Sequence, residues 1–347
     1  MQRIILALKD IFEGEIITAE TTRKNYSHDA SIYELVPDAV LFPKNSLDIR
    51  KLVTFVAEHK REYPSLSITP RSAGTDMSGA AIGNSLLVDM TKHFNTIHSV
   101  SRAELHTQPG VHMRDIDPRT NANGTMLGCV PASRAICTIG GMVGNNSGGE
   151  QSLRYGNTEN FVKELKVVFR DGKEYTVKPL TKRELDVKIA KGDFEGEIYR
   201  QVFELIEENY DIIKNSRPHV NKNSMGYNLW STWDRDTGIF DLTHLITGSQ
   251  GTLGIITDIK MHLVPKAPHT GLLVIYLPTI KQLGDIIKTV MAHEPATFEG
   301  FDDITFELGI KHFKVFKKQL GLKEWAKMQA QLAGSVAKFR GHLPHMI

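Results

Sequence analysis

The chain has 347 residues, of which 41% are hydrophobic and 24% are charged, and this composition is that of an ordinary soluble globular protein. This length predicts two domains, or one large domain plus part of another, whose cores need neither metals nor disulfides. The net charge of +2 comes from dispersed acids and bases, so we expect no nucleic-acid partner. Two cysteines, Cys129 and Cys137, are too few for a disulfide framework and indicate a reducing compartment.

No segment has the features of a signal peptide or of a membrane span. Charged residues occur from Lys9 onward, and no stretch approaches the roughly 20 apolar residues that a span requires. We therefore expect a cytoplasmic protein without a transmembrane segment, either free or peripheral at the membrane.

Helix-like and strand-like segments alternate in the first hundred residues. Apolar residues at helical spacing predict an amphipathic helix over 48–59, with Ser46 as its N-cap. Short strands are expected at 66–69 and 85–90. This order predicts a β-α-β arrangement.

A second block runs from about 101 to 268. The Asp171-Gly172 pair lies between two strand-like runs, 161–170 and 174–177, and predicts a hairpin. The other elements expected in this block are a helix at 199–210 and a long strand at 253–264.

Residues 266–269 are the best linker candidate in the chain. A new strand (271–277) and a new helix (280–293) are expected after them, so a further domain opens near residue 270.

The loop Pro70–Gly79 follows a predicted strand and consists largely of small residues. Such a loop allows several backbone N–H groups to converge on a phosphate or pyrophosphate. It matches neither the Walker pattern nor the Rossmann fingerprint. Considered alone, it is equally well explained as an ordinary loop.

A second motif, 131–149, holds five glycines and two asparagines in its last ten positions, against about 7% glycine in average proteins. Close approach of backbone to a planar or phosphorylated ligand is the usual reason for such glycine density. A flexible linker is the alternative, but the embedded Ile139, Met142 and Val143 favour a packed turn. A third, weaker glycine motif spans 247–256.

In this order and spacing, the three motifs resemble the FAD-binding domain of the vanillyl-alcohol oxidase/p-cresol methylhydroxylase (PCMH-type) flavoprotein family. The resemblance runs from Tyr33 to about Pro265, roughly two-thirds of the chain. The segment 223–229, followed by 248–256, is similar to the pattern of the D-lactate, glycolate and D-2-hydroxyglutarate dehydrogenase group.

The resemblance implies an α+β fold in which FAD lies between two α+β subdomains and a separate α+β cap domain covers the flavin. We expect a helical lead-in at 1–32 and an FAD-binding domain at 33–268, with subdomains of about 33–100 and 101–268. An incomplete, C-terminally truncated cap would occupy 269–347 and leave apolar surface exposed.

The resemblance also implies which residues bind the cofactor. The main chain around the first loop would hold the pyrophosphate, and the second loop with Ile255 would line the ribityl and isoalloxazine region. The residues implied are Pro70, Arg71, Ser72, Ala73, Gly74, Thr75, Asp76, Ser78, Pro131, Thr138, Gly140, Gly141, Asn145, Gly149 and Ile255.

Some relatives attach FAD covalently through a histidine at the position of Thr75, so we expect noncovalent FAD here. The two cysteines are alternative tethers, although buried structural thiols are favoured. A carboxylate substrate needs a cationic clamp, for which Lys222 and Tyr227 are the local candidates. A surface lysine and a core tyrosine explain these two residues equally well.

The implied chemistry is hydride transfer from C2 of a 2-hydroxy acid, such as D-lactate, glycolate or D-2-hydroxyglutarate, to flavin N5. The partners expected are this small acid and either a second polypeptide that completes the cap or an iron–sulfur or quinone electron acceptor. A non-catalytic FAD-binding or electron-transfer subunit is the alternative. A flavin reductase of the cell-wall precursor type fits the 223–256 segment less well.

The histidine-containing C-terminal motif of full-length relatives is missing. The chain is therefore expected to be a fragment, half of a two-chain enzyme, or a degenerate flavin module, and its general base stays unassigned. His342 and His345 form a His-x-x-His pair without a third ligand nearby, so we expect no metal site.

Overall fold

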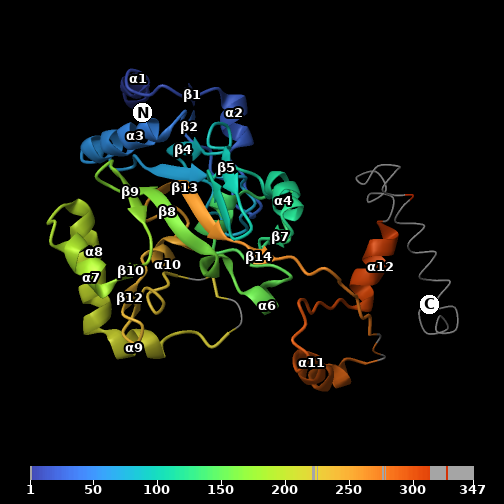
Figure 1. Cartoon of the computed structure of the whole chain (residues 1–347). Coiled ribbons are helices and arrows are strands. Elements are labelled where there is room, and N and C mark those ends of the chain that lie inside the picture. Colours follow the sequence, from blue (N-terminus) through green and yellow to red (C-terminus); the bar gives the residue numbers. More distant parts are fainter. Residues whose placement is uncertain are drawn as a thin grey trace. The chain divides into compact units, whose positions relative to one another are not determined.

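The computed structural model divides into two compact units, 1–297 and 298–347, which are described separately. Helices and strands mix in the first unit, so the predicted α+β class is confirmed (Figure 1). The residues described are 2–220, 223–224, 226–275, 277, 279–312 and 326. The expected boundary near residue 268 falls inside the first unit and stays a prediction.

A four-stranded sheet in the order β1-β2-β4-β3 forms the N-terminal part of the first unit. Strands β2, β4 and β3 are parallel, and α3 connects β2 to β3, as the predicted β-α-β order requires. Strand β1 pairs antiparallel with β2, so the N-terminal segment supplies a strand as well as helices. The elements are α1 (Gln2–Lys9), β1 (Glu15–Ile17), α2 (Glu20–Asn25), β2 (Ala39–Phe42), α3 (Ser46–His59), β3 (Ile68–Arg71) and β4 (Leu86–Asp89).

Helix α3 forms where its apolar spacing predicts it, but its N-cap is Asn45 rather than Ser46. The side-chain oxygen of Asn45 accepts the Asp48 N–H at 3.1 Å, so Ser46 becomes the first helical residue. The apolar face of the helix buries Ile49 and Leu52 against the first sheet.

A five-stranded antiparallel sheet in the order β5-β6-β13-β8-β9 forms the middle of the first unit. The predicted hairpin joins β8 to β9, and Gly172 in its turn has a φ of +74°, which glycine adopts readily. The strands are β5 (Ile97–Val100), β6 (Glu104–Thr107), β8 (Val162–Val168), β9 (Glu174–Val177) and β13 (Ile255–His262).

Shorter elements surround this sheet and share its core, which includes the fully buried Leu165, Tyr199 and Ile259. Two of them, β7 and β14, pair with each other, and β10, β12 and β11 form a small sheet. The predicted helix at 199–210 begins earlier, as part of α8. The elements are α4 (Met113–Ala122), β7 (Thr125–Met126), α5 (Ile139–Gly144), α6 (Ser152–Tyr155), the 3-10 helix η1 (Thr158–Asn160), β10 (Leu180–Thr181), α7 (Lys182–Ile189), α8 (Phe194–Glu208), α9 (Tyr210–Asn215), β11 (Trp233–Asp234), β12 (Ile239–Phe240), α10 (Thr243–Ile246) and β14 (Val264–Pro265).

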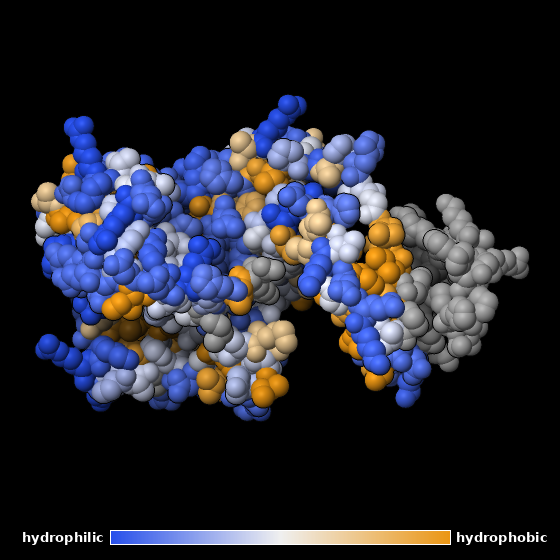
Figure 2. All heavy atoms as spheres, turned by 90° about the horizontal axis from the view of Figure 1, so that it is seen from below, coloured by the Kyte–Doolittle hydropathy of each residue, from blue (hydrophilic) through white to orange (hydrophobic). Residues whose placement is uncertain are grey.

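After β14 the chain forms the 3-10 helix η2 (Ile280–Gln282), α11 (Leu283–Met291) and, in the second unit, α12 (Asp303–Lys311). The strand predicted at 271–277 is wrong for the described residues, because none of them pairs with another strand. Their apolar side chains are exposed as expected, with Leu272 at 88% and Leu273 at 78%. Figure 2 shows that hydrophobic residues also lie on the surface of the described part of the chain.

The described part of the chain contains no helix that is both long enough and apolar enough to cross a bilayer. The His342–His345 pair lies outside the described residues.

Candidate functional site

The three glycine-rich loops meet around one cavity of about 940 Å³ in the first unit. This volume is that of a site for a large organic ligand. The lining comes from the loop after β3, from the region around α5, and from the turn that enters β13. The predicted residues that line it are Pro70, Arg71, Ser72, Ala73, Gly74, Thr75, Asp76, Ser78, Pro131, Thr138, Gly140, Gly141, Asn145 and Ile255.

The first loop leaves its backbone donors available. Gly74 has a φ of +67°, and a side chain there would strike the Arg71 guanidinium, which a Cβ would approach to 2.2 Å. Within the described residues, no acceptor takes the backbone N–H of Ser72, Ala73, Gly74 or Thr75. A ring of free N–H groups beside a cavity is the arrangement that binds phosphate oxygens.

Asp76 and Arg71 hold this loop in shape. The Asp76 carboxylate accepts the N–H groups of Ser78 and Ala80, both at 2.9 Å. The Arg71 Nη1 donates to the Ala81 carbonyl at 3.0 Å, and its guanidinium lies over the Tyr26 ring. Burial lowers the pKa of Arg71, but its ordinary value is so high that the side chain keeps its charge at neutral pH. The loop therefore carries one fixed cation.

The second loop contributes a short helix, α5, whose glycines have different roles. A Cβ on Gly140 would come within 2.5 Å of the Pro109 Cβ, so this glycine permits close packing. A Cβ on Gly141 would lie 3.4 Å from the Ser72 Cβ, and the first two loops therefore face each other. Gly144 lines the cavity, and a Cβ there would meet nothing within 4 Å.

Thr138, the N-cap residue of α5, has a buried hydroxyl group without a hydrogen-bond partner in the described structure. It is 1% exposed, caps no N–H of the helix, and leaves its Oγ1 without a hydrogen-bond partner among the described residues. Buried hydroxyl groups are normally hydrogen-bonded. An unpartnered hydroxyl in the wall of the cavity fits a ligand that supplies the missing acceptor or donor.

The third loop, 247–256, contacts both of the other loops. The Gln250 N–H donates to the Gly144 carbonyl at 2.8 Å, and the Gln250 Nε2 lies 3.3 Å from the Ser78 Oγ. Gly251 has a φ of +78°, and a Cβ there would come within 2.4 Å of the Pro70 Cγ. No side chain therefore fits at Gly251, where the third loop contacts Pro70 of the first loop.

Two of the other predicted residues, Gly149 and Tyr227, do not line this cavity. Gly149 is not among the lining residues, and a Cβ there would be 2.0 Å from the Val130 carbonyl oxygen. Lys222 lies outside the described residues. Tyr227 is 46% exposed and its hydroxyl lies 2.9 Å from the Thr252 Oγ1, away from the cavity lining.

The segment that contains Tyr227 borders a second cavity instead, of about 140 Å³. Its lining is polar and includes Arg217, Asn157 and Thr247. The Thr247 Oγ1 and the Asn157 Oδ1 are buried there without hydrogen-bond partners in the described structure.

The sequence did not indicate several residues of the large cavity. His28, Asp29 and Ala30 reach it from the loop after α2, and no local pattern marks them. Gly144, Gly148 and Gly251 belong to the glycine motifs, so their density was the signal that could have found them.

The two cysteines are buried, as expected. Burial raises the pKa of the Cys137 thiol and raises the pKa of Cys129 to about 12. Both thiols are therefore protonated at neutral pH and are poor nucleophiles.

The comparisons with known proteins agree with this geometry. Residues 37–178 match the family described as FAD binding domain. The fold resembles alkyldihydroxyacetonephosphate synthase, with a TM-score of 0.57, 18% identity, and coverage of 86% of this chain and 47% of that one. The chain therefore contains an FAD-binding domain of the PCMH-type flavoprotein fold, which confirms the resemblance seen in the sequence, while the predicted bounds of 33–268 stay a prediction.

The chain is also similar in sequence to curated proteins that are named as enzymes or enzyme subunits. The chain is 31% identical over 253 residues to D-2-hydroxyglutarate dehydrogenase of Escherichia coli (strain K12), across 72% of this chain and 25% of that protein. It is 29% identical over 286 residues to glycolate oxidase subunit GlcD of Bacillus subtilis (strain 168), across 81% of this chain and 49% of that protein. The chain thus spans between about a quarter and a half of the length of these relatives.

Proposed function

We propose that this chain is the flavin-binding part of an FAD-dependent dehydrogenase that oxidises a 2-hydroxy acid such as D-lactate, glycolate or D-2-hydroxyglutarate. The observation that carries the proposal is the meeting of three glycine-rich loops around one cavity, in a chain with an FAD-binding domain. The names of the two curated relatives support the substrate class.

The residues of the cavity fit FAD. The free N–H groups of Ser72–Thr75 would hold the pyrophosphate, and the fixed charge of Arg71 stands beside them. Gly141 and Gly144 let a flat ring approach the backbone, and the Thr138 hydroxyl offers it a hydrogen bond. When bound, FAD supplies the hydride acceptor. Thr75 and the protonated, buried thiols provide no reactive tether, so we propose noncovalent binding.

A FAD-binding subunit that needs a partner chain is the second candidate. Among the described cavity residues, the ionisable side chains are those of His28, Asp29, Arg71, Asp76 and Cys137. All of them except Cys137 belong to the side of the cavity that we assign to the pyrophosphate. None of these four side chains is therefore placed to take a proton from the substrate. Lys222 and Tyr227 stay our candidates for the substrate carboxylate. The relative from Bacillus subtilis is itself named as a subunit.

Reconstitution separates these candidates. We expect the purified chain to take up FAD in one equivalent, and acid precipitation of the protein to release all flavin into the supernatant. Bleaching of the bound flavin by one of the three hydroxy acids under anaerobic conditions supports the dehydrogenase. Flavin binding without bleaching supports the subunit. A chain that does not take up FAD contradicts both.

Substitution of Thr138 by valine should affect stability and cofactor binding in opposite directions. Removing an unpartnered buried hydroxyl stabilises the apoprotein by about 1 kcal/mol, while losing its hydrogen bond to FAD weakens binding by about tenfold. Thermal unfolding and flavin titration measure the two effects. Thr247→Val is the matched control, because its hydroxyl is also buried and unpartnered but borders only the smaller cavity. An equal loss of affinity in both variants contradicts the assignment of Thr138.

A further inference from the structure

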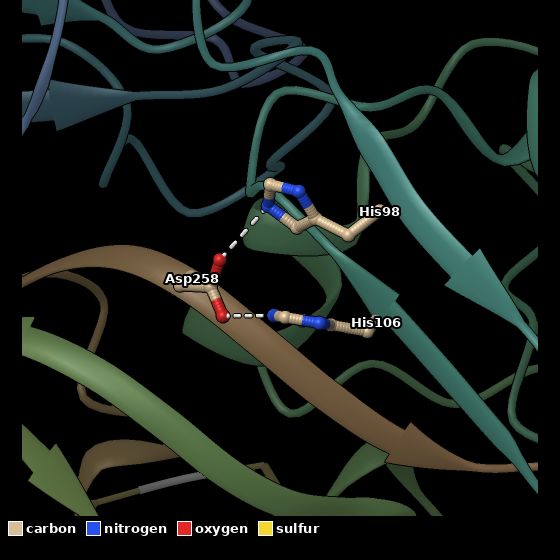
Figure 3. A group of neighbouring side chains, drawn as sticks. All are labelled: His98, His106 and Asp258. Carbon is tan, nitrogen blue, oxygen red and sulfur yellow. Dashed lines mark hydrogen bonds and ion pairs between the residues drawn. The ribbon is translucent and has the colours of Figure 1, made fainter.

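Two histidines and an aspartate converge on the five-stranded sheet, outside the FAD cavity (Figure 3). The His98 Nε2 lies 3.0 Å from the Asp258 Oδ2, and the His106 Nε2 lies 2.6 Å from the Asp258 Oδ1. The three side chains each offer one ligand atom, and these atoms lie within 4.8 Å of one another. Figure 3 shows both rings pointing toward the carboxylate from neighbouring strands.

The sheet brings these side chains together through its register. His106 pairs with Lys260 across β6 and β13, so Asp258, two residues from Lys260, projects from the same face. The register of β5 against β6 shifts around His98, and the register of β13 against β8 shifts just before Asp258. Such irregularities change the direction in which side chains project. Here they occur beside His98 and Asp258, whose side chains meet next to His106.

In the described structure, the Asp258 carboxylate pairs with the two histidines, because the nearby lysines pair with other acidic side chains. Lys260 pairs with Glu164 at 2.9 Å, and Lys163 pairs with Glu104 at 2.5 Å. No lysine or arginine in the described structure forms an ion pair with the Asp258 carboxylate, whose side chain is only 13% exposed. A largely buried carboxylate favours a nearby positive charge. A metal ion held between the three side chains would supply that charge.

Two imidazole nitrogens and one carboxylate oxygen are a typical ligand set for zinc and other divalent transition metals, and a poor one for magnesium or calcium. An ion equidistant from the three atoms would lie within about 2.8 Å of each, so shifts of under about 1 Å reach zinc–nitrogen bonds of about 2.1 Å. Each neutral ring would carry its proton on Nδ1, which leaves the Nε2 lone pair for the ion. His98 and His106 are 35% and 27% exposed, so an ion and a water ligand can enter from solvent.

We propose that His98, His106 and Asp258 form a binding site for one divalent transition metal ion, with Zn²⁺ as the preferred ion. The ion would link the edge strand β5 to β6 and β13. Asp258, its ligand on β13, lies three residues after Ile255 and two after Ile256, the residues of this strand that line the large cavity. The role assigned is structural, because no ligand atom lines the cavity.

Zinc titration of the whole chain, stripped with a chelator and free of flavin, tests this site. We expect one equivalent of zinc per chain by elemental analysis, and an increase in Tm when zinc is added. Removing one of three ligands should weaken binding by about tenfold or more, so His106→Gln and Asp258→Asn should lose both the zinc and the increase in Tm. His262→Gln is the control, because His262 is an exposed histidine on the same strand.

Several outcomes would overturn the proposal. Wild-type protein that holds no more zinc than His106→Gln has no site at these residues, and an equal loss in His262→Gln indicates adventitious binding to surface histidines. Far-ultraviolet circular dichroism and FAD uptake show whether a variant is folded. If His106→Gln does not fold, His98→Gln, at the most exposed of the three positions, decides the question with the same measurements.

Discussion

Replacing Gly144 by leucine is expected to weaken FAD binding by up to about 100-fold while the apoprotein stays folded. Gly144 lines the large cavity at the end of α5, its φ is not positive, and a Cβ would meet no atom within 4 Å. Because a Cβ at this position has open space, we expect the leucine side chain to extend into the cavity and to occupy space that the cofactor needs. Overpacking of this kind costs about 1–3 kcal/mol, and the upper end of that range corresponds to about 100-fold weaker binding.

Flavin titration followed by fluorescence measures this loss, and thermal unfolding of the apoprotein shows whether the fold is kept. Leucine has the higher helix propensity, so the apoprotein should be as stable as the wild type or slightly more stable. Gly284→Leu is the matched control, because Gly284 also lies in a helix, α11, with open space around its Cα, but is not part of the cavity. Unchanged FAD affinity in Gly144→Leu would mean that the flavin does not occupy this cavity.

The glycine motifs made the walls of the large cavity predictable from the sequence, because close approach of backbone segments excludes side chains locally. Gly140 and Gly251 illustrate the local exclusion of side chains, since a Cβ at either position would press on a neighbouring loop. The same signal is ambiguous for individual positions. Gly149 belongs to the densest motif, yet its missing side chain makes room for the Val130 carbonyl rather than for a ligand.

Features that depend on tertiary contacts could not be predicted. Asp258 and His106 are 152 residues apart, and only the register of β6 and β13 brings them together. Asp29 reaches the cavity from a loop without any motif. The apolar run at 271–277 has the composition of a strand, but a strand needs a neighbour, and no described strand pairs with it.

Loss of the Asp48 carboxylate is expected to cause the largest change in stability. Asp48 is fully buried at the start of α3. Its Oδ1 accepts the Glu13 N–H at 2.8 Å, and its Oδ2 accepts the N–H groups of Gly14 at 3.0 Å and Lys44 at 2.8 Å. One side chain thus joins the N-terminal segment, the end of β2 and α3. Asp48→Ala leaves three backbone donors without an acceptor, which costs about 3–5 kcal/mol of unfolding free energy.

Urea denaturation of the apoprotein, with the slope of the transition compared between variants, measures this effect. Asp48→Asn keeps one acceptor oxygen and should lose an intermediate amount, because its amide group cannot accept from all three donors. Asp10→Ala removes an exposed carboxylate from the same N-terminal segment and should change the free energy by less than about 0.5 kcal/mol. If Asp48→Ala were as stable as Asp10→Ala, the N-terminal segment would be held by its apolar contacts through Ile4, Leu8 and Phe12 alone. The gradation from Asp10→Ala through Asp48→Asn to Asp48→Ala therefore separates hydrogen bonding from hydrophobic packing as the force that fixes β1 to the first sheet.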